Sequence, residues 1–510
     1  MYKRQSNDTF IAVQVSSDSA LDADVTVSLQ HATDNQLIDI SDTSTLLVSG
    51  ENTVLIETFD FTLQTLYLKV DVGSATVGTL SISTSTKKKE DSGGAIGTQD
   101  VNVTNSPLDV EVGNQILKET NIDAFNRLRV SQVNSQADLK QIHDNLPLFY
   151  DIEEIGTGVA SHISSDAEST FNTSANNDVV IMQTKQRYNY RSGKSSLLYE
   201  TFRHFNTETN ITKRIGYYNS STVSPYNSDL DGFYLENANG VISFGIAKTG
   251  VINNVLQSNW DDPMDGTGES GVDLDLGTDT GNLLMWCDYE WLGVGQIRFG
   301  FVKDGTFYIA HKEDHIMLDG VYMSSPNHSI RAEIRQTGAG SGTFNLICAT
   351  YSSEGAINKL GKDGAIDGNA IKLDANSLSV WYYAIGIRLQ ASKLDTLVDI
   401  LGGYLLATTN DKFLYRVLLN PTYTGSVTYV DITNYSVSYA LGATSNGITS
   451  QGTILASGAG VQNSVQSFTL DSSIKLGAKI DGTLDEIVVV VKPLSSNLDI
   501  YRGINFRESD

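Results

Sequence analysis

Short apolar segments bounded by Gly, Asn and Asp recur along almost the whole chain, and this pattern limits the fold more than any other feature. Within them apolar and polar residues alternate, with many Val and Ile, which is typical of half-buried strands. Five such segments lie between residues 10 and 84: FIAVQVS, DVTVSLQHA, TVLIETFDF, TLYLKVDV and TVGTLSIS. We therefore predict a small antiparallel β-sandwich over residues 1–85.

The segment TKKKEDSGGAIGTQD at residues 86–100 combines charged residues with Ser and Gly and has almost no apolar anchor. This composition is typical of linkers, so we predict a linker and extended connector over residues 86–120.

The rest of the chain again shows strand patterns. The 23 Tyr and 44 Gly of the whole chain support this interpretation, because aromatic residues fill pleated faces and Gly permits tight turns. We predict an all-β chain with a large β-sandwich body over residues 121–510.

Two segments also fit helical spacing. SKLDTLVDILGG, at residues 392–403, places four apolar residues on one helical face and carries a capping box, but it also fits a buried strand. SQADLKQIHDNLP, at residues 135–147, would end as a helix at Pro147. Both are candidate helices in an otherwise β chain.

Charge and cysteine content exclude several classes of function. The chain has 35 Lys and Arg against 60 Asp and Glu, and its formal charge of −25 repels nucleic acid and acidic membrane surfaces. Cys287 and Cys348 match neither a zinc-site spacing nor a disulfide framework. The start MYKRQSNDTF has no apolar leader segment, and the longest strongly apolar run, IVVVV, is strand-sized. We expect a soluble protein with no cofactor, no nucleic-acid partner and no membrane insertion.

Three segments resemble ligand motifs, but each fails in one element. YRSGKSS at residues 190–196 ends like a phosphate-binding loop, yet Tyr188 stands where that loop needs glycine. GVGQIRFG at residues 293–300 begins like a dinucleotide fingerprint, yet Arg298 replaces the third glycine. HKEDH at residues 311–315 spaces two His as on a helix, yet it continues a strand-like segment. We interpret them as an exposed turn, a turn between strands and a strand end.

The segment DDPMDGTGESGVDLDLGTD at residues 261–279 carries seven acidic residues and no basic one. Carboxylates suit a hard cation such as Ca²⁺, and Asp273 and Asp275 are the candidate ligands. The order of an EF-hand is not met, because Thr278 takes its glycine position and Leu284 takes the position of its closing glutamate. The alternative is a long surface loop that binds no metal.

The stretch WCDYEWLGVGQIRFGFVKDG, residues 286–305, is the strongest candidate for chemistry. On a strand, Trp286, Asp288 and Glu290 share one face, and alternate residues lie roughly 7 Å apart. That spacing is within the range of glycosidase carboxylate pairs, and a neighbouring tryptophan can stack on a sugar. Catalysis, passive glycan contact and a purely structural role all fit these residues, and we favour the structural role. The spacing further indicates a strand, a glycine-containing turn and a second strand.

Seven separated segments carry no catalytic motif but follow a fixed order: DAFNRLRVS (123–131), KQRYNYRSGKSSLL (185–198), YEWLGVGQIRFGFVKDG (289–305), VYMSSPNHSIRAEI (321–334), FLYRVLLNPTYTG (413–425), DGTLDEIVVVV (481–491) and INFRE (504–508). In this order they resemble a family of structural proteins from tailed bacteriophages, especially accessory and fibre-like proteins. The resemblance spans about residues 120–510.

The resemblance implies a lectin-like, jelly-roll type β-sandwich body, with a lectin-like inserted subdomain at about residues 180–375. It also implies that residues 394–401 form a strand. The function implied is that of a non-enzymatic virion protein, assembled in the host cytoplasm, in which the N-terminal sandwich docks to the particle. Its expected partners are other virion proteins, further copies of itself in a homo-oligomer and host-surface glycans. We favour a place in the tail or its fibres.

Two alternatives remain open. In the first, the protein is a head decoration or head-fibre protein. In the second it is a virion-associated enzyme that degrades polysaccharide, with Asp288 or Glu290 as acid or nucleophile.

Overall fold

A computed structural model describes residues 133–510, except 293–294, 315–319, 356–360, 369–370, 410–411, 471–473, 496 and 510, together with backbone strands between residues 9 and 102. The chain divides into two compact units, Met1–Lys118 and Glu119–Asp510. Both consist of antiparallel sheets, so the predicted all-β class is confirmed.

The first unit contains two four-stranded sheets. One has the order β5 (Thr53–Thr58), β1 (Thr9–Ser17), β7 (Thr79–Lys88) and β8 (Gly97–Asn102). In the other, β2 (Val25–Thr33) pairs with β3 (Gln36–Asp39), β4 (Thr45–Leu47) and β6 (Leu66–Asp71). The five strands expected from alternation are present. The linker prediction is wrong over residues 86–88, which belong to β7, and over residues 97–102, because β8 pairs with β7 and extends the first sheet.

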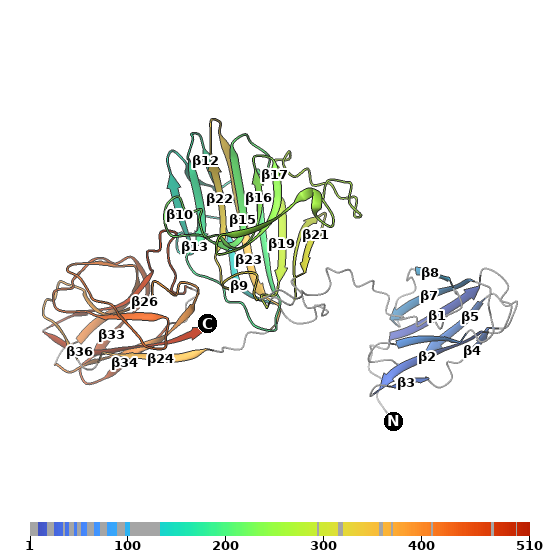
Figure 1. Ribbon diagram of the computed structural model, residues 1–510. Helices are drawn as coiled ribbons and strands as arrows, with labels where there is room; N and C mark the ends of the chain where they lie inside the picture. Colours follow the sequence, from blue (N-terminus) through green and yellow to red (C-terminus); the bar gives the residue numbers. More distant parts are fainter. Residues whose placement is uncertain are drawn as a thin grey trace, which may run out of the picture. The chain divides into compact units, whose positions relative to one another are not determined.

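A seven-stranded sheet begins the second unit, and most of its strands are labelled in Figure 1. Its order is β10 (Tyr150–Ile155), β13 (Val179–Thr184), β22 (Ile330–Gln336), β15 (Ile211–Asn219), β16 (Asp231–Ala238), β17 (Val241–Lys248) and β18 (Val251–Leu256). Neighbouring strands come from distant parts of the chain, since β22 lies between β13 and β15. The sheet is therefore defined by long-range pairing and not by local hairpins alone.

An eight-stranded sheet packs against it. The order is β11 (Val159–Ile163), β12 (Glu168–Thr173), β23 (Gly342–Ser353), β14 (Ser196–Arg203), β19 (Leu283–Tyr289), β20 (Gln296–Lys303) and β21 (Thr306–Asp314), with β9 (Asn134–Lys140) also on β23. One buried cluster, which includes Tyr217, Phe233, Tyr289, Phe299 and Tyr351, fills the space between the sheets. Tyr and Phe dominate this core because a ring on each sheet spans a sandwich about 10 Å thick.

A second sandwich follows in the same unit, with its own buried cluster. Its five-stranded sheet contains β24 (Lys362–Asp367), β36 (Leu498–Ser509), β27 (Leu397–Ala407), β34 (Val465–Thr469) and β25 (Leu373–Ala375). The six-stranded sheet has the order β30 (Val430–Asp431), β31 (Val437–Leu441), β26 (Tyr382–Leu389), β35 (Glu486–Pro493), β28 (Lys412–Leu419) and β33 (Thr453–Val461). A short pair, β29 (Thr422–Tyr423) and β32 (Ile448–Ser450), completes it.

Both candidate helices are wrong. Residues 134–140 form β9 on β23, and residues 397–407 form β27, as the resemblance implied. β27 pairs with β36 on one side and β34 on the other, and these ladders outweigh a helical spacing of leucines. Among the described residues, a short 3-10 turn at Gln257–Asn259 has helical geometry. In that part of the chain, no helix has the length and apolarity to cross a bilayer.

Candidate functional site

The stretch around Trp286 and Asp288 forms the strand pair that its spacing predicted. β19 ends at Tyr289, β20 begins at Gln296, and a turn at Asp304 and Gly305 leads from β20 into β21. Trp286 and Asp288 share the face of β19 that points away from the sandwich core, while Cys287 and Tyr289 belong to the core.

Cross-strand neighbours enclose these side chains. Asp288 lies directly opposite Arg298, whose Nε donates to Oδ1 at 2.8 Å, and a second bond joins Nη2 to Oδ2. Trp286 lies opposite Gly300, where a Cβ would sit 2.5 Å from the indole, so glycine makes room for the ring. The indole Nε1 donates to the carbonyl of Phe301 at 3.3 Å.

Burial removes the predicted glycan contact. Trp286 and Asp288 are 0% exposed and Glu290 is 1% exposed, so none of the three presents a side chain to solvent. A Cβ on Gly295 would lie 1.3 Å from Oε1 of Glu290, so the Glu290 carboxyl packs against the glycine of the turn. The prediction that these residues touch a glycan is therefore wrong for this fold, because the Arg298 ion pair, the packing of the indole at Gly300 and the Gly295 turn enclose them.

The acidic loop satisfies its own backbone. Asp273 Oδ1 accepts a bond from the amide of Asp275 at 2.8 Å, and Asp265 and Asp279 accept from amides two residues ahead in the same way. Asp262 is buried and accepts from the amide of Ser270 at 2.8 Å. Over the described residues no group of three or more potential metal ligands gathers. The cation site predicted at Asp273 and Asp275 is thus not supported, since the Asp273 carboxylate takes part in a turn and no third ligand gathers with them among the described residues.

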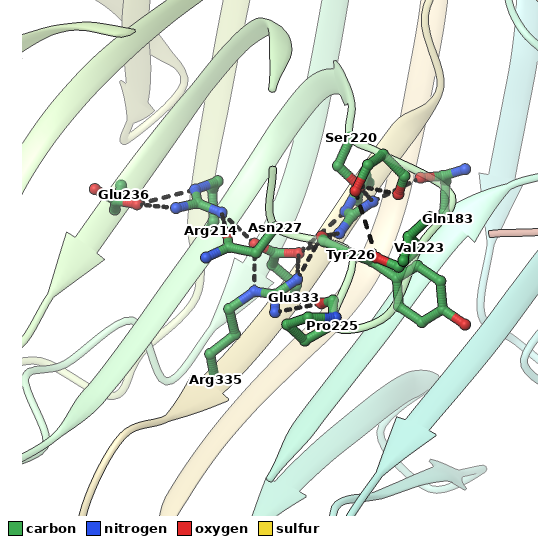
Figure 2. Close-up of polar contacts among 12 residues, drawn as sticks. Gln183, Arg214, Ser220, Val223, Pro225, Tyr226, Asn227, Glu236, Glu333 and Arg335 are labelled. Carbon is green, nitrogen blue, oxygen red and sulfur yellow. Dashed lines mark hydrogen bonds and ion pairs between the residues drawn. The ribbon is translucent and has the colours of Figure 1, made fainter. Parts of the chain in front are cut away.

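A buried network of arginine and glutamate lies on the seven-stranded sheet (Figure 2). Arg331, Glu333 and Arg335 alternate along β22, so their side chains share the face opposite the core. Glu333 Oε2 accepts from Nη2 of Arg331 at 2.6 Å and from Nη2 of Arg335 at 2.9 Å. Arg214 of β15 reaches Glu333 with Nη1 and donates through Nε to Glu236 of β16 at 2.9 Å.

This network holds the loop between β15 and β16 onto the sheet. Nη2 of Arg331 and Nη2 of Arg335 both donate to the carbonyl of Tyr226 at 2.8 Å, and Nη1 of Arg335 donates to the carbonyl of Pro225 at 2.8 Å. Figure 2 shows the loop residues lying directly against the guanidinium groups. The loop therefore covers this polar face of the sheet, and the arginines act as its anchor.

Electrostatics keep the central carboxylate charged. Burial alone would raise the pKa of Glu333, but the guanidinium groups of Arg335, Arg331 and Arg214 hold it well below 4.5. A permanently ionised carboxylate saturated with donors neither gives nor takes a proton near neutral pH. The network is suited to stability and not to acid–base chemistry.

A partly exposed aromatic and cationic group lies on the six-stranded sheet of the second sandwich, on the face away from its core. We name it the aromatic–arginine patch, and it comprises Trp381, Arg388, Arg416, Tyr423, Tyr429 and Glu486. The guanidinium of Arg388 lies 3.8 Å from the ring centre of Tyr429, and that of Arg416 lies 4.4 Å from the ring of Trp381. Such stacking favours a defined orientation of the two rings.

Strand register assembles the patch. Arg388 of β26 lies directly opposite Glu486 of β35. Tyr423 donates from its hydroxyl to Oε2 of Glu486 at 3.4 Å. Burial raises the pKa of Glu486, although the tyrosine hydroxyls and Arg388 oppose the shift. In the part of the chain that the structure describes, this patch combines partly exposed aromatic rings with positively and negatively charged side chains.

Neither group was recognised from the sequence. The alternation IRAEIRQ at residues 330–336 is a detectable signal, because charged residues occupy every second position of a strand. The aromatic–arginine patch has no such signal, since its members are spread over about a hundred residues and are joined by register alone.

No protein-family model and no curated protein matches this chain in sequence. The chain is similar in structure to the carbohydrate recognition domain of Emp47p, with 14% identity over 44% of this chain and 99% of that chain, at a TM-score of 0.30. The VIP36 exoplasmic/lumenal domain in a Ca²⁺/Man3GlcNAc-bound form is 10% identical over 45% of this chain and 93% of that chain, at a TM-score of 0.30. A Bacillus licheniformis β-glucanase is 11% identical over 44% of this chain and 98% of that chain, at a TM-score of 0.29. These similarities carry no argument about ligand or activity.

Proposed function

We propose that this chain is a non-enzymatic structural component of a tailed-bacteriophage virion, associated with the tail or its fibres, which also contacts host-surface glycans. The observation that carries the non-enzymatic part of this proposal is the burial of Asp288 and Glu290, its most enzyme-like residues, at 0% and 1% exposure. A glycosidase needs two carboxyl groups that face a substrate across a cleft. Here the carboxylates serve packing and an ion pair, which favours a scaffold over an enzyme.

The wider architecture is consistent with assembly and display. Charged networks such as that of Glu333 anchor loops within sheets, and large aromatic clusters fill the sandwich of β10–β23. The resemblance of seven segments to phage structural proteins supplies the virion setting. A head decoration or head-fibre protein is the alternative within the same class.

Localisation on intact particles tests the virion part. Antibodies against the purified chain should label the tail of virus particles in electron micrographs. Labelling of the head would favour the alternative. Absence of the chain from purified particles by mass spectrometry, in a preparation where other structural proteins are found, would contradict both.

Within this proposal, we assign glycan contact to the aromatic–arginine patch in place of the buried Trp286. Aromatic ring faces stack on the apolar faces of sugars, and guanidinium and carboxylate groups bond to hydroxyls. Exposed Thr422, Thr424 and Thr428 border the patch and add hydroxyls around Tyr423 and Tyr429. The patch thus offers the mixture of flat apolar and polar surface that saccharides require.

Removal of Trp381 tests this assignment. Trp381→Ala should weaken binding of the full chain to a host polysaccharide, or to its best ligand on a glycan array, by about tenfold or more, which is ~1.4 kcal/mol. The reason is loss of the stacking surface that Arg416 orients. Surface plasmon resonance would measure it.

The matched control is Tyr501→Ala, a partly exposed aromatic on β36 of the other sheet of the same sandwich. It should bind as the parent does. Equal losses of glycan affinity in both variants would mean that the binding site is not the aromatic–arginine patch. If the parent binds no host glycan, the glycan-contact part of the proposal is wrong, and the scaffold role is tested by the labelling experiment alone.

A further inference from the structure

The strand β18 leaves one edge of the seven-stranded sheet open. It pairs with β17 on one side, and no second strand of the described chain pairs with its other side. Its apolar side chains are exposed: Val251 by 75%, Ile252 by 46% and Leu256 by 42%. An exposed, apolar edge strand offers unpaired backbone groups to another strand.

Three other edge strands of this sandwich, β10, β11 and β21, are blocked. β10 carries three acidic residues, and one of them, Asp151, accepts a bond from the amide of Ile480 at 2.9 Å. On β11, the amide of Ala160 donates a hydrogen bond to the carboxylate of Glu154 at 2.6 Å. β21 ends in charged residues, and the Asp261 carboxylate accepts from its Lys312 amide at 2.8 Å. Natural sheets use such charges and caps to prevent edge pairing, and β18 differs from these three strands in having none of them.

Charge singles out the same edge. Residues 249–260 include no charged side chain, although the whole chain has a formal charge of −25. Like-charged copies repel one another, and a contact between them is least costly where neither carries charge. β18 is therefore suited to meet a second copy of this acidic chain.

The sequence of β18, VINNVL, is complementary to itself in antiparallel pairing. Residues on one face read Val251, Asn253, Val255, and those on the other read Ile252, Asn254, Leu256. Each face is thus an asparagine flanked by two apolar residues. A twofold axis through Asn253 brings Val251 opposite Val255 of the second copy, and one through Asn254 brings Ile252 opposite Leu256.

From these observations we infer that β18 is a self-association edge, along which two copies of the chain join their seven-stranded sheets into one continuous sheet. The twofold axis is perpendicular to that sheet, because antiparallel partners must keep side chains of the same residue on the same side. Apolar cross-strand pairs and a central Asn–Asn pair stabilise the contact. This inference specifies an interface for the expected homo-oligomer and does not rest on the proposed function.

A charge placed on the edge tests the inference. Sedimentation equilibrium of the full chain should give an oligomer, and Ile252→Lys should weaken its association by about tenfold or more, because each copy brings a cation to the contact. The control is Val241→Lys, at an exposed valine of β17, a strand that is paired on both sides. This control should associate like the parent, and thermal unfolding should confirm that both variants fold.

Cross-linking tests the geometry. Directly opposed residues of antiparallel strands lie within disulfide reach, so Asn253→Cys or Asn254→Cys should form a disulfide with its own copy, in a chain where Cys348 is replaced by Ser. Cross-linking at either position supports the twofold pairing. A parent that stays monomeric at roughly 100 μM, an oligomer that Ile252→Lys leaves intact, or the absence of a disulfide at both positions would each overturn the inference.

Discussion

Replacement of Glu333 by glutamine should lower the free energy of unfolding of the β10–β23 sandwich by about 3–5 kcal/mol, the largest effect we expect from a single side chain. Glu333 is 0% exposed and accepts bonds from Arg331, Arg335 and Arg214. A neutral amide leaves these buried guanidinium groups without their shared counter-charge and loosens the loop anchored at Tyr226. Urea denaturation followed by tryptophan fluorescence reports this sandwich, because it holds Trp260, Trp286 and Trp291 of the chain's 4 tryptophans.

The matched control is Glu236→Gln on the neighbouring strand. Glu236 is also buried, but within the network it meets Arg214 alone. Its loss should therefore be clearly smaller than that of Glu333→Gln. If the two variants lose equal stability, Glu333 is not the centre of the network.

The same carboxylate contributes to acid sensitivity. Because its folded-state pKa lies below the ordinary 4.5, its stabilising contribution is present above pH 4.5 and is lost as the pH falls toward the folded value. The acid limb of the parent's stability curve should flatten in Glu333→Gln.

Replacement of Glu200 by methionine should have the opposite effect and stabilise the protein increasingly as the pH rises. Glu200 lies on β14, 0% exposed, and neither carboxyl oxygen has a hydrogen-bond partner among the described residues. Burial raises its pKa well above 4.5. Since the folded value exceeds the unfolded one, the contribution of Glu200 to stability is most favourable below pH 4.5 and falls by about 1.4 kcal/mol per pH unit up to the folded pKa.

Stability measured by urea denaturation between pH 4.5 and 9 would check this expectation. The advantage of Glu200→Met over the parent should be small near pH 4.5 and grow with pH. Glu200→Gln, which has the same shape without the titrating proton, should share the loss of pH dependence but stabilise less, because its amide is buried without partners. Parallel curves for parent and both variants would mean that Glu200 does not carry this proton linkage.

The sequence allowed the class of fold to be predicted well and the exposure of the site poorly. Alternation placed Trp286 and Asp288 on one face of a strand, and the structure agrees. Alternation says nothing of what lies beside that strand. Arg298 and Gly300 arrive opposite them through the β19–β20 register, and this pairing turns an apparent binding face into a buried ion pair and a packed indole.

The helical spacing of Leu394, Leu397, Val398 and Leu401 shows the same limit. A strand buried between two neighbours carries apolar residues on both faces, and in a short segment such a run matches a helical stripe as well as a strand. β36, which pairs with β27 there, lies about a hundred residues further along the chain. A local pattern cannot record a partner so distant.

By itself, the sequence determined that this chain is all-β, where many of its strands run and which side chains share a face of each, because the period of two is a local property of an extended backbone. Tertiary structure alone decided which faces are covered. The pairing of β19 with β20 encloses Trp286 and Asp288, and the register of the distant strands β26 and β35 brings Arg388 opposite Glu486. The sheet order leaves β18 paired on one side among the described strands. Burial depends on which strands pair and in which register, and alternation within one strand does not specify that pairing.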